Sequence, residues 1–208
     1  MRTLTEEKRQ AIIDAAAQVF QEMGYERASM NEVAKRAGGS KATLYNYFPS
    51  KEALFETVVR TYSTRFLAEA AAELDLPEDG PRSLEDKLTR FGEKMMHVLI
   101  GGNPALQIYR IVVGEAGHSD IGALFQGSGP KESMSRLADL MADAMQTGEL
   151  AQSDPMLRAM QFTSLVKAEA DAVLLQRELP DYSTAQVKKM VRNGVQLFLH
   201  GASSLADK

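Results

Sequence analysis

Side chains that can bind phosphate or read the edges of nucleic-acid bases are concentrated in the segment AGGSKATLYNYFPSKEALF, residues 37–55. Lysine, threonine, asparagine and tyrosine hydroxyl groups can all make such contacts. Leu44 and Phe48 are four positions apart, so they lie on one face of a short helix and are expected to point inward. The residues left largely outward are Lys41, Ala42, Thr43, Tyr45, Asn46 and Tyr47. A merely solvated helical face with two amphipathic tyrosines would give the same pattern.

Short helices must position this segment. Apolar residues at spacings of three and four predict a first helix over about residues 5–23, which Gly24 ends. Ser29 can cap a second helix, Gly38 can adopt the left-handed backbone of a sharp turn, and Ser40 can cap a third helix. A helix, a three-residue turn and a short helix form a helix-turn-helix, whose second helix can enter the major groove of DNA.

Lys51 adds to this interpretation. It follows Ser50, which can cap a fourth helix, so the lysine falls in the first turn of that helix. A lysine there opposes the helix dipole and costs a few tenths of a kcal/mol, roughly, at an exposed site. The same helix end offers unpaired N–H groups that favour a phosphate. We therefore expect Lys51 to help bind the DNA backbone.

The run GYERASMNEVAKRAGGSKATLYNYFPSKEALF, residues 24–55, resembles the N-terminal domain of the TetR family of bacterial transcriptional regulators. The positions that carry the resemblance are Gly24-Tyr25, Ala34, Ala37-Gly38, Thr43-Leu44-Tyr45, Tyr47-Phe48 and Lys51, and the similarity covers roughly residues 5–55. At Gly39 the family usually has a small apolar side chain that seals the turn, so a looser turn is expected in this chain.

The resemblance implies a set of DNA contacts. Carried over by position, it assigns them to Lys41, Ala42, Thr43, Tyr45, Asn46, Tyr47 and Lys51. Ser29, at the start of the preceding helix, completes the candidate set. The implied partner is double-stranded DNA with a near-palindromic operator.

The rest of the chain also predicts helices. Residues 75–82 are expected to form a loop, Ser83 to begin a helix, and the glycine-rich residues 114–130 to hold a short helical piece. The fold class is therefore all-α. We expect a three-helix helix-turn-helix domain at residues 1–50 and a larger helical domain for ligand binding and dimerisation at residues 51–208.

Two long helices are predicted at the end of the chain, over about residues 155–178 and 185–200. Both helices carry more apolar surface than packing against one layer of the same domain would bury. The family resemblance implies that they pair with their counterparts in a second subunit as a four-helix bundle, whereas periodicity alone also allows an ordinary hairpin within one chain. The candidate residues of a homodimer interface are Leu165, Ala172, Val191, Val195 and Phe198.

Methionines and aromatic residues in the predicted regulatory domain indicate a ligand pocket. Flexible thioethers line adaptable apolar cavities, although they also fill ordinary cores. The candidate lining residues are Phe91, Met95, Tyr109, Phe125, Met141 and Phe162. The phrase YRIVVGEAG…LFQGSGP resembles a segment in the regulatory domains of one branch of the family. A small, largely apolar effector is the implied partner.

Composition narrows the remaining possibilities. The net charge is −4, yet residues 1–55 hold eight Lys/Arg and seven Asp/Glu, so this segment is less acidic than the rest. The absence of cysteine excludes disulfide and thiolate chemistry. No apolar signal core and no membrane-length run occur in the sequence, so a cytoplasmic location without a membrane partner is expected.

Catalysis has little support in the sequence. His97, His118 and His200 lie far apart, and none has a metal-ligand spacing such as HExxH. His118 lies near Glu115 and Asp120, but a loop histidine is usually solvated, so no metal or other cofactor is expected. An enzyme of unknown class is therefore a weak alternative. A ligand-independent architectural DNA-binding dimer is the other, and it predicts no internal pocket. We predict a non-enzymatic regulator, a repressor that its effector displaces from DNA.

Overall fold

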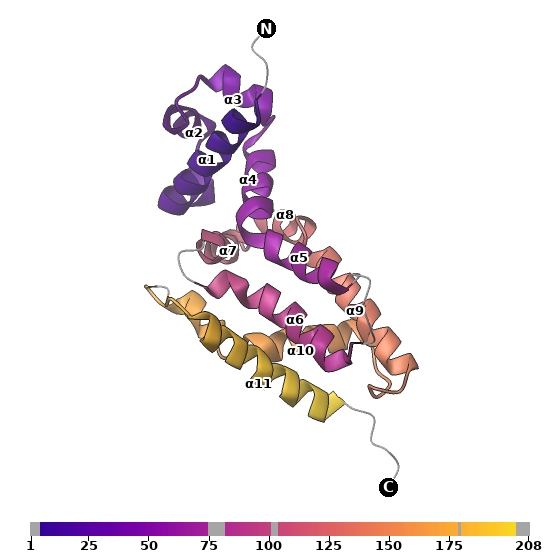
Figure 1. Ribbon diagram of the computed structural model, residues 1–208. Coiled ribbons are helices and arrows are strands. Elements are labelled where there is room, and N and C mark those ends of the chain that lie inside the picture. Colours follow the sequence, from indigo (N-terminus) through magenta and orange to yellow (C-terminus); the bar gives the residue numbers. More distant parts are fainter. Residues whose placement is uncertain (1–4, 75–81, 101–103, 179, 203–208) are drawn as a thin grey trace. The chain divides into compact units, whose positions relative to one another are not determined.

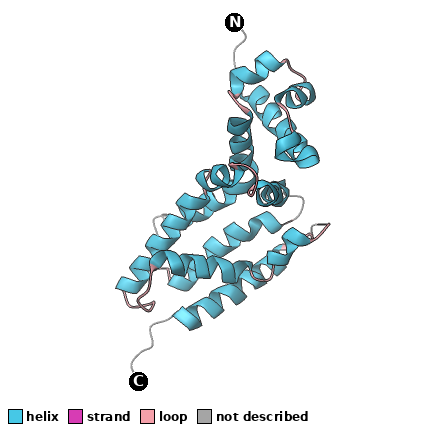
Figure 2. Cartoon of the chain, turned by 180° about the vertical axis from the view of Figure 1, so that it is seen from behind, coloured by secondary structure: helices cyan, strands magenta, loops and turns pink. Residues whose placement is uncertain are grey.

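The computed structural model describes residues 5–74, 82–100, 104–178 and 180–202. Helices dominate these ranges, as Figure 2 shows, and the only β pairing within them is an isolated bridge between Ile100 and Tyr182. No helix among the described residues is long and apolar enough to cross a membrane. The predicted all-α fold class is confirmed.

The chain divides into two compact units. The first unit contains residues 1–65 and 104–128, and the second contains residues 66–103 and 129–208. The predicted N-terminal domain, residues 1–50, thus lies in one unit with residues 51–65 and with a later segment of the chain.

The first four helices of the first unit begin as their capping residues predict. Their bounds are α1 Glu6–Arg27, α2 Met30–Arg36, α3 Lys41–Tyr47, α4 Lys51–Val59, the π-helical turn η1 Arg60–Thr64, α7 Pro104–Glu115 and α8 Ile121–Gly127. Hydroxyl groups of Thr5, Ser29, Ser40 and Ser50 each accept a hydrogen bond from the first turn of α1 to α4, respectively. Gly24 breaks the regular backbone of α1 at φ 75°, after which one further turn follows.

One hydrophobic core holds this unit together. It gathers Ile12 and Phe20 of α1, Phe55 of α4, Ile108 of α7 and Phe125 of α8, together with other buried residues of α1 to α4. The Phe20 and Phe55 rings meet edge to face, with centroids 5.1 Å apart. Burial of these shared faces makes α7 and α8 part of the same packed body as the N-terminal helices.

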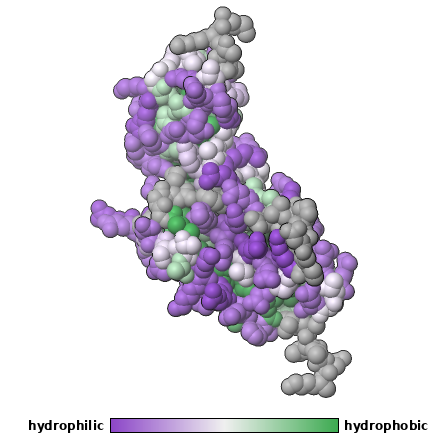
Figure 3. Space-filling model, in the orientation of Figure 1, coloured by the Kyte–Doolittle hydropathy of each residue, from purple (hydrophilic) through white to green (hydrophobic). Residues whose placement is uncertain are grey.

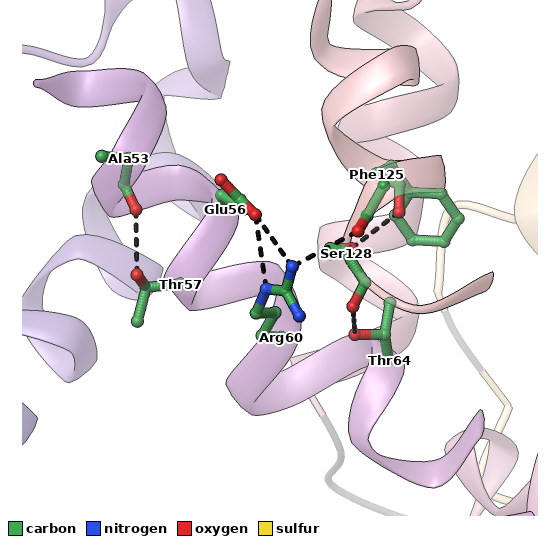
Figure 4. A network of polar contacts seen from close by, with 8 residues as sticks. Ala53, Glu56, Thr57, Arg60, Thr64, Phe125 and Ser128 are labelled. Carbon is green, nitrogen blue, oxygen red and sulfur yellow. Dashed lines mark hydrogen bonds and ion pairs between the residues drawn. The ribbon is translucent and has the colours of Figure 1, made fainter. Parts of the chain in front are cut away.

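Polar contacts link η1 to the end of α8 within this unit (Figure 4). The Arg60 guanidinium binds Glu56 at 3.0 Å and donates to the Gly127 carbonyl at 3.3 Å. The buried Thr64 hydroxyl donates to the Ser128 carbonyl at 2.9 Å. Carbonyl groups at the end of a helix lack partners within that helix. The η1 side chains therefore satisfy groups that α8 leaves open.

The second unit is also helical. Its elements are α5 Arg65–Leu74, whose residues from 66 onward belong here, α6 Leu84–Met95, η2 Met96–Leu99, α9 Pro130–Gln146, α10 Pro155–Lys167, η3 Asp171–Leu175 and α11 Thr184–Ala202. Helices α6, α10 and α11 lie side by side (Figure 1). A Cβ atom on Gly194 of α11 would lie 2.8 Å from the Val166 Cα atom of α10. Glycine at this position therefore permits the two helices to approach closely.

Two segments expected from the sequence either differ in the structure or lie outside the described residues. The predicted helix over residues 155–178 is wrong in its length, because α10 ends at Lys167 and the chain continues as the 3₁₀ turn η3. Bonds that span three residues, such as Val173 N–H to the Ala170 carbonyl, replace the α-helical pattern. With three residues per turn, Ala170 and Val173 lie one above the other, and both are buried. The predicted loop at 75–82 lies outside the described residues except for Arg82.

Candidate nucleic-acid interface

The turn between α2 and α3 is a Schellman motif. The Gly39 N–H donates to the Ala34 carbonyl at 2.9 Å, and the Gly38 N–H donates to the Lys35 carbonyl at 3.2 Å. Gly38 has a φ of 65°, a left-handed conformation that side-chain-bearing residues rarely adopt. The motif ends α2 and turns the chain sharply into α3.

Helix α3 has the predicted orientation. Leu44 is 1% exposed and Phe48 is 3% exposed, so both side chains anchor the segment in the core. Four of the outward candidates are exposed, namely Lys41, Ala42, Tyr45 and Asn46, while Thr43 and Tyr47 are partly buried. The result is a short helix with a hydrogen-bonding face toward solvent and two apolar residues beneath it.

Local hydrogen bonds orient several of these side chains. The hydroxyl groups of Ser40 and Thr43 are 2.9 Å apart, and the Tyr47 hydroxyl accepts the Thr5 N–H at 2.9 Å. The Lys41 ammonium lies over the Tyr45 ring at 5.8 Å from its centroid. Tyr47 still carries an O–H that can donate to an oxygen atom of a ligand.

Ser29 is exposed, and its hydroxyl accepts the Glu32 N–H at 3.2 Å. It therefore caps α2, as its sequence position indicates. The serine proton remains able to donate to a phosphate oxygen, so the capping role and the proposed DNA contact are compatible.

Lys51 is held by the protein itself. Its ammonium group donates to the Tyr25 carbonyl at 3.0 Å and lies 4.3 Å from the centroid of the Tyr25 ring. The hydroxyl of Tyr25 donates a hydrogen bond to the Glu52 carboxylate at 3.3 Å. Burial together with this carboxylate raises the pKa of Tyr25. Lys51 thus fastens the start of α4 to the end of α1, a role that sequence reasoning missed.

A hollow of about 1060 Å³ lies beside the turn. Its lining includes two lysines that were not among the predicted site residues, Lys8 and Lys35. Lys8 donates to the carbonyl groups of Ala37 and Gly38, whereas Lys35 is exposed. Lys8 occupies the first turn of α1, where a lysine opposes the helix dipole. The same signal that drew attention to Lys51 could have identified it.

The six pocket candidates fall into two groups. Phe91, Met95, Met141 and Phe162 are buried in the second unit, where the rings of Phe91 and Phe162 have centroids 6.3 Å apart. Tyr109 and Phe125 belong to the first unit, with centroids 5.3 Å apart. A hollow of about 450 Å³ on the second unit is lined by polar and charged residues of α6 and η2 and includes none of the six.

The dimer candidates also differ in their surroundings. Val191, Val195 and Phe198 are buried within the single chain, so they have almost no surface left for a partner. This corrects the expectation that these three side chains form the interface. Leu165 is partly buried and Ala172 is exposed. The large apolar side chains that α10 and α11 leave exposed are Met156, Leu157, Met160 and Leu197.

Among the described residues, no group of three or more histidine, aspartate or glutamate side chains gathers as a metal site would require. His118 lies in the turn that follows α7, and it is exposed. Nothing in the described part of the chain therefore adds support for the metal alternative at Glu115, His118 and Asp120.

Comparison with known protein families gives two matches. A model described as bacterial regulatory proteins, tetR family, matches residues 12–58. A second model, described as the C-terminal domain of AefR-like transcriptional repressors, matches residues 86–201. The first match includes α2, α3 and most of α4, and the second spans more than half of the chain.

Solved structures match the chain over almost its whole length. The Flavonoid-responsive Regulator FrrA is 33% identical, with a TM-score of 0.71, and the match covers 97% of this chain and 100% of that chain. A TetR-family transcriptional regulator from Mesorhizobium loti MAFF303099 has a TM-score of 0.77 at 23% identity, covering 98% and 100% of the two chains. The second likeness shows the fold alone.

Matches to curated relatives are shorter. The HTH-type transcriptional activator FasR of Mycolicibacterium smegmatis is 32% identical over 92 residues, which are 44% of this chain and 42% of that protein. The chain spans less than half of the length of the curated relatives it matches.

Proposed function

Because the chain belongs to the TetR family of bacterial regulatory proteins, whose members are DNA-binding transcriptional regulators and not enzymes, we propose that it is a repressor released from a near-palindromic operator by a small, largely apolar effector. It acts as a homodimer, and no cofactor is needed. The cytoplasm, where the DNA lies, is the proposed location.

The exposed face of α3 carries this proposal. Leu44 and Phe48 hold the helix against the core, which leaves Lys41, Tyr45 and Asn46 exposed to solvent. An asparagine amide can donate to and accept from an adenine edge, whereas a lysine ammonium can bind guanine or a phosphate. The arrangement suits insertion of α3 into a major groove.

The residues around α3 are proposed to bind the backbone of the same site. Ser29 at the start of α2, Tyr47 at the end of α3 and Lys51 at the start of α4 each keep a donor that can meet a phosphate oxygen. Thr43 shares its hydroxyl with Ser40, and Ala42 offers a methyl group for contact with thymine. Together these groups position α3, while the side chains on its exposed face read the sequence.

The effector proposal rests on the regulatory part of the chain. FrrA, which is similar over its whole length, is named for its response to flavonoids. Flavonoids are flat, aromatic and only moderately polar, and aromatic side chains such as the buried Phe91 and Phe162 of the second unit are of the kind that lines sites for such ligands. The four candidates of that unit are therefore the first residues to test as pocket lining, ahead of Tyr109 and Phe125.

The homodimer is proposed on the outer faces of α10 and α11. Met160 is 55% exposed and Leu197 is 62% exposed, which is unusual for large apolar side chains on consecutive helices. Leu165 and Ala172 remain interface candidates because neither is fully buried within the chain. A single α3 helix makes only a short, weak contact with DNA, so two linked half-sites are needed for useful affinity.

Activation is the second candidate function. The relative FasR, which shares about two fifths of its length with this chain, is named as a transcriptional activator. Both modes use the same DNA contacts, and they differ in where the operator lies relative to the promoter.

Selection from a pool of duplexes with randomised sequence tests the proposal. The purified protein should enrich a near-palindromic sequence, and a flavonoid such as quercetin should release the enriched duplex. Enrichment of no sequence would contradict specific DNA binding. Enrichment of a sequence without symmetry would contradict the dimer, and transcription in vitro from a promoter carrying the selected site separates repression from activation.

A further inference from the structure

Two residues that are unusual for their positions at helix ends, Lys8 and Gly39, lie in contact beside α3. Lys8 is the third residue of α1, a position where glutamate or glutamine is favoured and where a positive charge opposes the dipole. Gly39 is the residue of the Schellman motif whose side chain usually makes an apolar contact with the end of the helix. A locally unfavourable residue and a missing side chain, 31 positions apart in sequence, lie in contact.

The geometry of this contact is specific. A Cβ atom built on Gly39 would lie 3.6 Å from both the Cε and Nζ atoms of Lys8, an ordinary van der Waals distance. The Lys8 ammonium donates to the Ala37 carbonyl at 2.7 Å and to the Gly38 carbonyl at 3.4 Å. The end of the lysine chain thus lies beside the space that a side chain at position 39 would occupy, and its charge binds the two carbonyl groups that lead into the turn.

We propose that Lys8 is a positioning residue for α3. Lys8 compensates for the missing side chain at Gly39 and fixes the turn that orients α3. This inference rests on the proposed role of α3 in DNA binding. Lys8 carries no base information itself, and it acts through the conformation of residues 37–40. A charge-assisted bond at 2.7 Å in a partly buried setting is stronger than one between neutral groups.

The start of α1 also holds the other end of α3. The Thr5 N–H donates to the hydroxyl of Tyr47, the last residue of the helix, at 2.9 Å. Lys8, in the first turn of α1, therefore fixes the entry to α3, and Thr5, the capping residue of α1, fixes its exit. A helix of two turns has few internal hydrogen bonds, so its direction depends on these external contacts.

The competing role for Lys8 is direct binding of a DNA phosphate. Its neighbour in the same hollow, Lys35, is exposed and serves as the comparison. A lysine that binds phosphate contributes about one to the salt slope and acts equally on all sequences. A lysine that positions α3 raises the affinity for the selected sequence without changing that salt slope.

The test compares Lys8→Met, Lys8→Arg, Lys35→Met and the double variant Lys8→Met with Gly39→Ala. Binding is titrated across salt concentration on the duplex that the wild type selects from a random pool and on a scrambled duplex. Lys8→Met should bind the selected duplex with about tenfold lower affinity than the wild type, equivalent to about 1.4 kcal/mol. Its affinity for the scrambled duplex should change little, and the salt slope should not change. Lys8→Arg should remain close to wild type, and Gly39→Ala should restore part of the loss.

Amide hydrogen exchange on the free protein gives a second reading that does not depend on DNA. Lys8→Met should accelerate exchange of the Gly38 and Gly39 N–H groups more than that of Leu54 in α4. No acceleration would overturn the proposal, even if the wild type selected no duplex and the proposed DNA-binding function itself failed. A salt slope lowered by about one, with equal losses on both duplexes, would overturn it in favour of phosphate binding.

Discussion

The lysines around α3 differ in what their ammonium groups already bind. Lys8 and Lys51 each donate to backbone carbonyl groups of the protein, whereas Lys41 lies over an aromatic ring and Lys35 is exposed. An ammonium group has three donors, so Lys51 can retain its carbonyl partner and still meet a phosphate. Its removal is therefore expected to affect both folding and DNA binding.

Replacing Lys51 by alanine should lower the salt slope of DNA binding by about one, because one phosphate contact is lost. It should also lower the free energy of unfolding by about 1 kcal/mol, because the Tyr25 carbonyl loses its donor. Binding titrations across salt and urea unfolding measure the two effects. An unchanged salt slope together with lower stability would leave Lys51 a purely structural residue.

Asn46→Ala is the matched contrast, since Asn46 is exposed. It should leave the salt slope and stability unchanged but reduce discrimination by about 1–3 kcal/mol at particular base pairs. Titration of operator variants with single substitutions locates those pairs. Equal losses on every variant would show that Asn46 does not read bases.

The hydroxyl of Tyr62 links η1 to α1 by donating to Asp14. Burial and this hydrogen bond raise the pKa of Tyr62 from 10.0 to about 12. A raised pKa means that the neutral form is favoured in the folded state, so the contribution is complete below about pH 10 and is lost as pH rises through about 12. The stability difference between wild type and Tyr62→Phe should therefore narrow over this interval.

Thermal unfolding at a series of alkaline pH values measures this difference. Tyr45→Phe is the control, because Tyr45 lies on the exposed face of α3 and loss of its hydroxyl should not alter how stability changes with pH. A constant gap between wild type and Tyr62→Phe from pH 9 to pH 12 would contradict the assigned role.

Among the elements of the first unit, η1 departs from α-helical hydrogen bonding. A π-helical turn is rare and is frequently found at functional sites. Here it follows α4, and its residues Arg60 and Thr64 donate to the carbonyl groups of Gly127, the last residue of α8, and of Ser128, the residue after it (Figure 4). The contacts provide a physical link between the helix that begins at the DNA-binding segment and the helix α8.

Thr64→Val should lower the free energy of unfolding by about 1–3 kcal/mol, because valine has the same shape but leaves the buried Ser128 carbonyl without its donor. Chemical denaturation measures the change. Thr64→Ser keeps the hydroxyl and should cost less than valine does. Equal destabilisation by serine and valine would show that the methyl group, and not the hydrogen bond, is what matters.

Much of the element structure follows from local sequence chemistry. The capping residues Thr5, Ser29, Ser40 and Ser50 and the inward pair Leu44 and Phe48 were all predictable, because a cap or a helical stripe depends on residues within a few positions. The 3₁₀ turn after Lys167 was not, since the sequence there also suits a continued helix and only packing decides between them.

The candidate site was predictable to a similar extent. The outward residues of α3 follow from its periodicity, and four of them are exposed. The carbonyl contacts of Lys8 and Lys51 were not predictable, because each joins residues more than 20 positions apart. The burial of Val195 and Phe198 within one chain was missed for a related reason: periodicity identifies an apolar face but does not say whether the same chain or a second copy covers it.

At the scale of the whole molecule, α10 and α11 have an inner and an outer apolar surface. The inner one is buried in the chain, and the outer one includes Met160 and Leu197. The face seen in Figure 3 is mostly hydrophilic, with small separate hydrophobic patches. Exposed apolar residues on two neighbouring helices therefore need an explanation, and a second copy of the chain provides one.

Leu197→Asp should yield a folded monomer that binds the selected duplex poorly, because each interface residue occurs twice in a two-fold dimer. Val195→Asp should instead unfold the second unit, since it places an unpaired charge in the core. Sedimentation velocity and thermal unfolding distinguish the two results. A wild-type monomer at micromolar concentration, or an intact Leu197→Asp dimer, would contradict this interface.

Control of DNA binding by an effector must be reciprocal. If quercetin lowers the affinity of the protein for its operator by a given factor, the operator must lower the affinity for quercetin by the same factor, because both paths connect the same four states. A typical coupling of about 1–3 kcal/mol corresponds to roughly 5–150-fold. Titration calorimetry on the free protein and on the operator complex measures one leg, and operator titrations with and without quercetin measure the other. A factor clearly above one on both legs would show that quercetin binding and operator binding are coupled. Equal quercetin affinity for the free protein and the complex would show that the ligand, even when bound, does not control DNA binding.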